Sequence, residues 1–200
     1  MKITDLSQPL GPDTLTYPGD DPLSMTVTQA CPQTTYLQTG SHIGTHIDAP
    51  RHAFPGGREI DSFPLSTFYG EALCVAPEIR DGLIQAPDCE AEGCGILVVA
   101  TFWQRKTRDG KSFLLDFPGF SDALCRYILD RGFRLVATDV PSVDSLPGFR
   151  CHNALLEKDI PLVEGLVIPR ELAGARFVFA AFPLSIPCDS SPVRAVAIEL

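Results

Sequence analysis

The chain has 200 residues, with 16 lysines and arginines against 25 aspartates and glutamates, and a formal net charge of −9 at pH 7. A protein this acidic is repelled by nucleic acid and by anionic membrane surfaces, so neither is expected as a partner. Hydrophobic residues make up 44% of the chain, which excludes the disordered class. The length fits one hydrophobic core, so we expect residues 1–200 to form a single domain.

Short runs rich in β-branched or aromatic residues predict the strands. In chain order these are Lys2–Leu6, Leu23–Thr28, Tyr36–Ile43, Glu71–Ala76, Ile96–Thr101, Arg134–Thr138, Leu162–Ile168, Arg176–Phe182 and Val193–Ile198. A helix is predicted over Asp122–Arg131, because Ser121 can cap its first turn and Gly132 can end it. A shorter helix is predicted over His152–Lys158. Many short strands with few helices indicate a β-rich α+β or mixed α/β domain.

Several features bear on the compartment. The first residues carry charges at Lys2 and Asp5 and no apolar core, so they do not resemble a signal peptide. The longest apolar runs, 93–104 and 177–188, are shorter than the ~20 residues of a membrane helix. Seven scattered cysteines without a C-x-x-C pair indicate reduced, mostly buried thiols. We therefore expect a cytoplasmic protein, and we interpret the charged segment 105–110 as a solvated turn.

Three of the four histidines, His42, His46 and His52, fall within eleven residues. In an extended chain these three and Asp48 point to one face, while the intervening isoleucines point to the other. His46 and Asp48 would be about 6.6 Å apart along a strand, a comfortable separation for two ligands of one metal ion. A bend at Gly44 would bring His42 to the same place, because glycine tolerates the dihedral angles of a bend.

The chemistry of this cluster predicts a metal site. Without a cation, several polar groups would share one face with too few partners. The nitrogen and oxygen donors, with no thiolate in the run, suit zinc, manganese or iron. His52 can reach the site only if the chain turns at Pro50, so we assign it acid–base work rather than coordination. Cys151, beside His152, is expected to point away from the site.

The run from His42 to His52 reads H-x-G-T-H-x-D-x-P-x-H and resembles the signature of the metal-dependent cyclase family, which includes bacterial kynurenine formamidases. Segments 16–20, 138–144 and 188–195 also resemble that family's motifs, in the same order along the chain. The resemblance extends over nearly the whole sequence. It implies a swivelling β/β/α-type domain with a barrel-like β centre flanked by helices, assembled as a homodimer or a larger homo-oligomer.

The resemblance also implies roles for particular residues. The implied metal ligands are His42, His46, Asp48, His152 and Glu164. Asp48 would bridge two ions if two are bound; zinc is the first expectation and manganese the second. His52 would be the catalytic acid–base residue. Tyr17 would contact the substrate, and it stands where kynurenine formamidases carry tryptophan. Asn153 replaces a histidine that they often have, so the substrate itself is left open.

The implied activity is hydrolysis of a small amide, either an aryl formamide such as N-formylkynurenine or a cyclic amide. A metal ion would lower the pKa of a bound water toward about 7, so that it could attack the carbonyl group. Two alternatives stay open. One is a non-haem iron oxygenase, since His46, Asp48 and His152 have the composition of a facial triad. The other is a metal- or metabolite-binding protein without catalytic activity.

Overall fold

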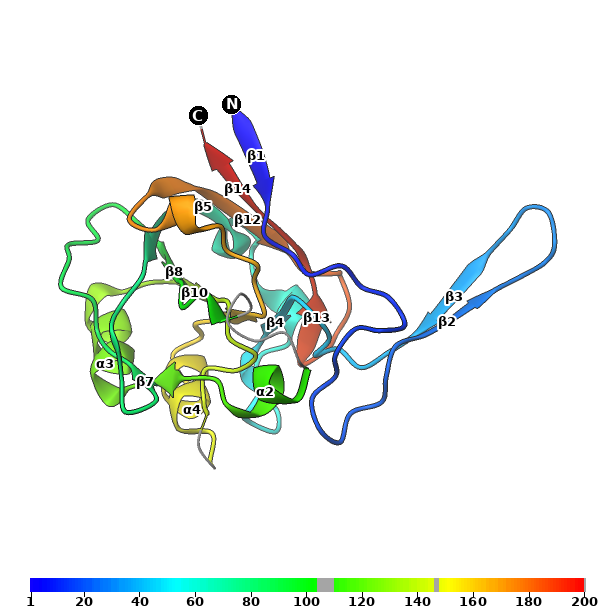
Figure 1. The fold of residues 1–200 in the computed structure, drawn as a ribbon, viewed down its shortest axis with the longest axis horizontal. Helices are drawn as coiled ribbons and strands as arrows, with labels where there is room; N and C mark the ends of the chain where they lie inside the picture. The colour runs from blue at the N-terminus through cyan, green and yellow to red at the C-terminus, as the bar shows by residue number, and fades with distance from the viewer. Residues whose placement is uncertain (104–109, 146–147, 200) are drawn as a thin grey trace.

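The computed structural model describes residues 1–103, 110–145 and 148–199 (Figure 1). Its strands are β1 (Lys2–Asp5), β2 (Ser24–Val27), β3 (Thr35–Gln38), β4 (His46–Asp48), β5 (Tyr69–Val75), β6 (Ile79–Arg80), β7 (Leu83–Ile84), β8 (Ile96–Val99), β9 (Gly119–Phe120), β10 (Leu135–Thr138), β11 (Leu162–Glu164), β12 (Arg176–Phe182), β13 (Ser190–Pro192) and β14 (Arg194–Glu199). The α-helices are α2 (Gly110–Leu115), α3 (Asp122–Arg131) and α4 (Arg150–Leu156). Short 3-10 helices cover Pro50–His52, Ile60–Ser62, Leu65–Phe68 and Arg170–Leu172. The predicted turn at 105–110 lies, apart from Gly110, outside the described residues.

One large sheet organises the molecule. Its nine strands follow the order β1-β14-β12-β5-β8-β10-β11-β4-β13. The four central strands β5, β8, β10 and β11 are parallel, and the remaining pairs are antiparallel. The sheet curls strongly into a half-barrel (Figure 1). This β-rich mixed α/β architecture with few helices confirms the expected fold class.

The sheet is covered on both faces, which explains its nearly continuous apolar strands. In β8, Ile96 and Val98 pack into the same core as Phe179. The alternate residues Leu97 and Val99 pack into a second core, to which α3 and α4 contribute. Among the described residues, no helix is both long enough and apolar enough to span a bilayer.

Local sequence signals located several elements well. The strand β12 and the helix α3 have the predicted bounds. The side chain of Ser121 accepts a hydrogen bond from the backbone N–H of Leu124, and Gly132 ends the helix with φ at 69°. The second helix, α4, begins at Arg150, two residues earlier than predicted.

Two predicted strands are too long, and a glycine explains the end of one of them. The strand predicted to reach Ile43 ends at Gln38, and the strand predicted to reach Ile168 ends at Glu164. Gly165, directly after β11, adopts a φ of 69°, which turns the chain out of the ladder; Gly44, with a φ of 59°, bends the chain just before β4. A Cβ atom on Gly165 would lie 2.5 Å from the carbonyl oxygen of Gly44. The two bends therefore require glycine where they meet.

Candidate metal centre

Strand β4 presents His46 and Asp48 on one side of the sheet and buries Ile47 completely on the other. This confirms the predicted alternation. Strand β11 pairs antiparallel with β4, so that Glu164 lies directly opposite His46. The Nε2 atom of His46 lies 3.6 Å from an oxygen of Asp48 and 3.6 Å from an oxygen of Glu164.

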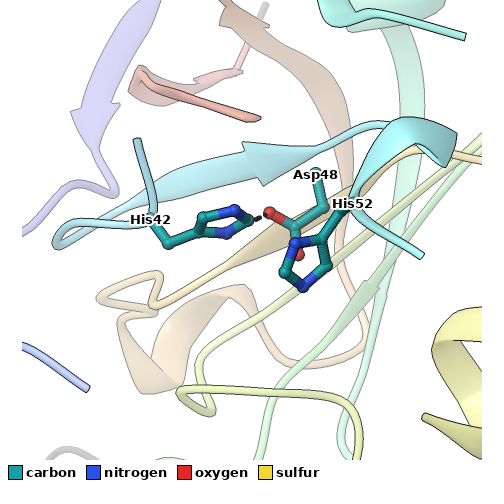
Figure 2. A group of neighbouring side chains, drawn as sticks. All are labelled: His42, Asp48 and His52. Carbon is teal, nitrogen blue, oxygen red and sulfur yellow. Dashed lines mark ion pairs between the residues drawn. The ribbon is translucent and has the colours of Figure 1, made fainter. Parts of the chain in front are cut away.

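His42 reaches the same place through the bend at Gly44. Its Nδ1 atom lies 2.9 Å from Oδ1 of Asp48, and its Nε2 atom lies 2.9 Å from Oδ2 of Asp189 (Figure 2). Burial disfavours the charged imidazole, but the two carboxylates outweigh this effect and raise the pKa of His42 to about 9. The ring of His42 is therefore held between two carboxylates, that of Asp48 within the cluster and that of Asp189 on the opposite side of the ring.

His152 enters from the first turn of α4. Its Nε2 atom lies 3.6 Å from Asp48 and 3.4 Å from Glu164. Its Nδ1 atom lies 2.8 Å from Asp144, which also accepts the backbone N–H of His152 and of Cys151. Asp144 thus fixes both the start of the helix and the orientation of the imidazole ring.

A 3-10 turn that begins at Pro50 brings His52 to the cluster. This is the turn at Pro50 that the sequence predicts His52 would need to reach the site. Its ring centroid lies 4.1 Å from that of His42 and 5.6 Å from that of His152. Figure 2 shows the rings of His42 and His52 next to the carboxylate of Asp48. Burial lowers the pKa of His52, and this effect exceeds the opposing attraction of Asp48. The ring is therefore neutral near pH 7.

The carboxylate of Asp48 supplies a test of whether a cation fits here. Asp48 is 1% exposed, and neither of its oxygens has a hydrogen-bond partner within the described part of the chain. Ring nitrogens of His42, His46 and His152 lie 2.9–3.6 Å away without satisfying hydrogen-bond geometry. A buried carboxylate left in this state is costly, whereas imidazole nitrogens and carboxylate oxygens are good ligands of divalent cations. The residues present fit such an ion.

The structure thus brings together all six residues singled out from the sequence as metal ligands or as the acid–base group. Candidate ligand atoms of His42, Asp48 and His52 lie within 4.8 Å of one another, as do those of His46, Asp48 and Glu164. The individual roles stay predictions. Cys151 lies outside the site, as expected, with its sulfur 2.9 Å from that of Cys125.

Some contacts of the site were not predicted. Glu164 was found only through the family resemblance; the signal in the sequence is a lone carboxylate within the apolar run 160–168. Asp144 and Asp189 lie in the segments 138–144 and 188–195 that resemble the family's motifs, and the sequence indicates no role for either. The structure shows that each holds a histidine ring by the nitrogen that faces away from Asp48.

A cavity of about 580 Å³ opens above the cluster. Besides the cluster, its walls include Leu15, Tyr17, Phe113, Leu115, Phe117 and Phe149. The ring of Phe149 lies 5.2 Å from that of His52 and 4.8 Å from that of His152. Tyr17, which the resemblance implies as a substrate contact, is one of the residues that line this cavity. The cavity therefore combines a polar floor with an aromatic and aliphatic wall.

Comparisons with known proteins agree with this geometry. The family model described as "Putative cyclase" matches residues 4–145. A kynurenine formamidase of Salinibacter ruber is 34% identical over 98% of this chain and 97% of its own. A kynurenine formamidase of Bacillus anthracis is 29% identical over 98% of this chain and 96% of its own.

Solved structures share the fold. A potential metal-dependent hydrolase with cyclase activity superposes with a TM-score of 0.82 at 21% identity, over 98% of this chain and 96% of that one. Isatin hydrolase A from Labrenzia aggregata, bound to benzyl benzoate, gives a TM-score of 0.82 at 22% identity, over 98% of this chain and 93% of that one.

Proposed function

Because this chain belongs to the cyclase family, we propose that it is a metal-dependent hydrolase that cleaves the C–N bond of a small amide. The substrate class is an aryl formamide or a cyclic amide, as the names of the kynurenine formamidase and isatin hydrolase relatives suggest. The observation that carries the proposal is the buried carboxylate of Asp48, which has no hydrogen-bond partner among the described residues and faces several imidazoles.

Five residues would hold the cation: His42, His46, Asp48, His152 and Glu164. A bound divalent ion supplies two things, a lowered pKa for water and stabilisation of negative charge on a carbonyl oxygen. Zinc is the first choice and manganese the second, with one or two ions per chain. A facial triad for an iron oxygenase would use only two histidines and one carboxylate. The convergence of six residues favours the hydrolase.

His52 is proposed as the acid–base residue. Its lowered pKa leaves the imidazole able to accept a proton near pH 7. It would take the proton from the attacking water and deliver it to the departing amine nitrogen. Water and amide are thus converted into a carboxylic acid and an amine, with no other reactant. Its ring lies between His42 and Phe149, at the boundary of the polar floor and the aromatic wall.

The size and lining of the cavity support a small aromatic substrate. A volume of about 580 Å³ lies within the range of pockets for small molecules. Aromatic rings prefer edge-to-face or offset packing, which Tyr17, Phe113 and Phe149 can offer. We propose Tyr17 as a substrate contact at this wall.

We further propose that residues 1–200 act as one domain and assemble as a homo-oligomer. Strand β1 pairs with the last strand, β14, so both ends of the chain belong to one sheet (Figure 1). Small-molecule amides are the proposed partners, and nucleic acid and membranes are not, given the acidic charge.

The test is a substrate panel on protein freed of metal by a chelator and then reloaded with zinc or manganese. The panel contains formanilide, N-formylkynurenine and isatin. Hydrolysis of at least one compound by the reloaded protein, and none by the chelated protein, supports the proposal. Metal-loaded protein that is inactive on every compound favours the non-catalytic binding protein instead.

A further inference from the structure

A buried carboxylate outside the metal cluster organises the chain where it leaves the sheet. Asp139 directly follows β10, and it is 1% exposed. Its Oδ1 atom accepts hydrogen bonds from the backbone N–H and from the hydroxyl group of Thr101, both at 2.8 Å. Its Oδ2 atom accepts one from the backbone N–H of Phe102, at 2.5 Å. Asp139 therefore pairs two N–H groups that lie beyond the end of β8, the parallel neighbour of β10.

This carboxylate holds Phe102 in a backbone conformation that bulky residues rarely adopt. The φ of Phe102 is 57°, in the left-handed region that favours glycine, asparagine and aspartate. Such strain persists only where the surrounding structure fixes it, and it occurs often at functional sites. The ring of Phe102 packs against the core that contains Phe179, whereas Trp103 packs against the second core. The turn therefore directs two consecutive aromatic side chains to different cores.

Trp103 connects this turn to the wall of the cavity. Its indole Nε1 atom donates a hydrogen bond to the carbonyl oxygen of Phe113, at 3.0 Å. Phe113 belongs to α2 and lines the cavity above the metal centre. A helix of six residues is not stable by itself, and its last four carbonyl groups have no partner within the helix. The indole is the partner of one of these carbonyl groups, so it helps to hold α2 in place.

We infer that Trp103, fixed by the turn that Asp139 stabilises, is a positioning residue that sets the place of Phe113 in the aromatic wall and thereby favours aryl amides over aliphatic amides. The substrate preference rests on the proposed amide hydrolysis, whereas the placement of Phe113 does not. Contact between two aromatic rings depends on their relative position, so a displaced Phe113 would contact an aryl group poorly. A small aliphatic amide has no ring to make this contact.

The first test is the variant Trp103→Phe, which keeps an aromatic ring but loses the indole N–H. We expect the KM for formanilide to rise by about 3- to 10-fold, the effect of one lost hydrogen bond, with kcat changed by less than about twofold. The kinetic constants for N-methylformamide should not change. The control Tyr127→Phe also removes a side-chain donor to a backbone carbonyl, that of Cys89, outside the cavity. It should match wild type on both amides.

A double-mutant cycle tests whether Trp103 acts through Phe113. Phe113→Leu removes the ring that is positioned, so adding Trp103→Phe should not raise the KM for formanilide any further. Additive effects of the two substitutions would overturn the inference. Equal losses on formanilide and N-methylformamide, or a loss of thermal stability with an unchanged KM, would also overturn it, because they would show a merely structural role.

A binding measurement separates the positioning role from the proposed activity. Calorimetric titration of zinc-loaded protein with acetanilide, an aryl amide, needs no turnover. The dissociation constant should rise by about 3- to 10-fold in Trp103→Phe and stay unchanged in Tyr127→Phe. This difference without hydrolysis of any amide would reject the proposed function and leave the positioning role standing. Equal affinity in wild type and Trp103→Phe, or no binding of acetanilide to wild type, would overturn the positioning role.

The contribution of Asp139 is measured from the fluorescence of Trp103, the only tryptophan in the chain. Asp139→Asn keeps the size of the side chain but turns one acceptor into an amide donor that faces backbone N–H groups. We expect quenching by acrylamide to increase by about twofold or more, because local opening exposes the indole. Asp130→Asn, on the exposed surface of α3, is the control and should be quenched as wild type is. Equal quenching in both variants would overturn the link between Asp139 and Trp103, and the affinity of Trp103→Phe decides the inference if Asp139→Asn does not fold.

Discussion

Asp144 lies 2.8 Å from the Nδ1 atom of His152 and leaves the Nε2 atom of the same ring facing Asp48 and Glu164. A carboxylate only accepts hydrogen bonds, so in the neutral form of the ring this contact places the proton on Nδ1 and the free electron pair on Nε2. An imidazole held in this way is prepared to bind a cation. Asp189 makes the corresponding contact with His42 on the other side of the centre.

Replacing Asp144 with asparagine keeps the shape of the side chain but removes its charge. We expect the affinity for zinc to fall by about 10- to 100-fold, because the ring of His152 loses its orientation and part of its basicity. Competition with a metal-binding dye measures this. Asp130→Asn, on the exposed surface of α3, is the matched control. Equal affinity in both variants would show that Asp144 does not support the site.

Replacing His52 with alanine tests its assignment as the acid–base group. We expect turnover of the amide identified in the panel to fall by about 10²- to 10⁴-fold. The metal content per chain, measured by elemental analysis, should be unchanged. If metal is lost together with turnover, His52 is a ligand and its proposed role is wrong.

The pH dependence of stability follows from His42. In the metal-free protein burial opposes its charge, but Asp48 and Asp189 outweigh burial and raise its pKa from 6.5 to about 9. A raised pKa stabilises the fold fully below about pH 6.5, and this stabilisation is lost as the pH rises through about 9. The loss is at most about 3 kcal/mol in the free energy of unfolding.

Urea unfolding of chelated protein at pH 6.5 and above pH 9 measures the effect. Zinc-loaded protein is the comparison, and it should lack this trend because the cation replaces the proton. A metal-free protein that becomes more stable over the same pH window would contradict the expected sign.

The close approach of Gly165 to Gly44 predicts a steric effect on folding. Gly165→Ala adds a Cβ atom 2.5 Å from a backbone oxygen, at a φ of 69°. Gly56→Ala is the control, because Gly56 has a φ of 80° with nothing within 4 Å. We expect Gly165→Ala to cost about 1–3 kcal/mol more than the control in the free energy of unfolding. Equal costs would mean that the chain relaxes around the added methyl group.

The parts of the fold that were predicted correctly are those whose signals are local. The helix α3 carries its own cap at Ser121 and its own stop at Gly132, and β12 is one apolar run. Strands β4 and β13 have three residues each and pair with one another, with Ser191 opposite Ile47. Such short segments are strands only because distant neighbours pair with them, so their bounds could not be predicted from propensity.

The candidate site likewise contains residues that local spacing predicts and residues that it does not. His42, His46, Asp48 and His52 lie within eleven residues, so their alternation and the bend at Gly44 could be predicted. Asp189 contacts His42 across 147 positions of sequence, and spacing gives no indication of a contact at that distance. Asp189 and Asp144 orient the histidine rings from the side opposite Asp48. Such contacts depend on which distant strands and loops the fold brings together, and no local sequence pattern describes that.

The most direct measurement is anomalous diffraction from crystals grown with zinc and collected at the zinc absorption edge. We expect an anomalous peak enclosed by His46, Asp48, His152 and Glu164, with His42 turned toward the same centre. A map without a peak at Asp48, in crystals whose zinc lies elsewhere, would contradict the existence of this metal site and with it the proposed hydrolase.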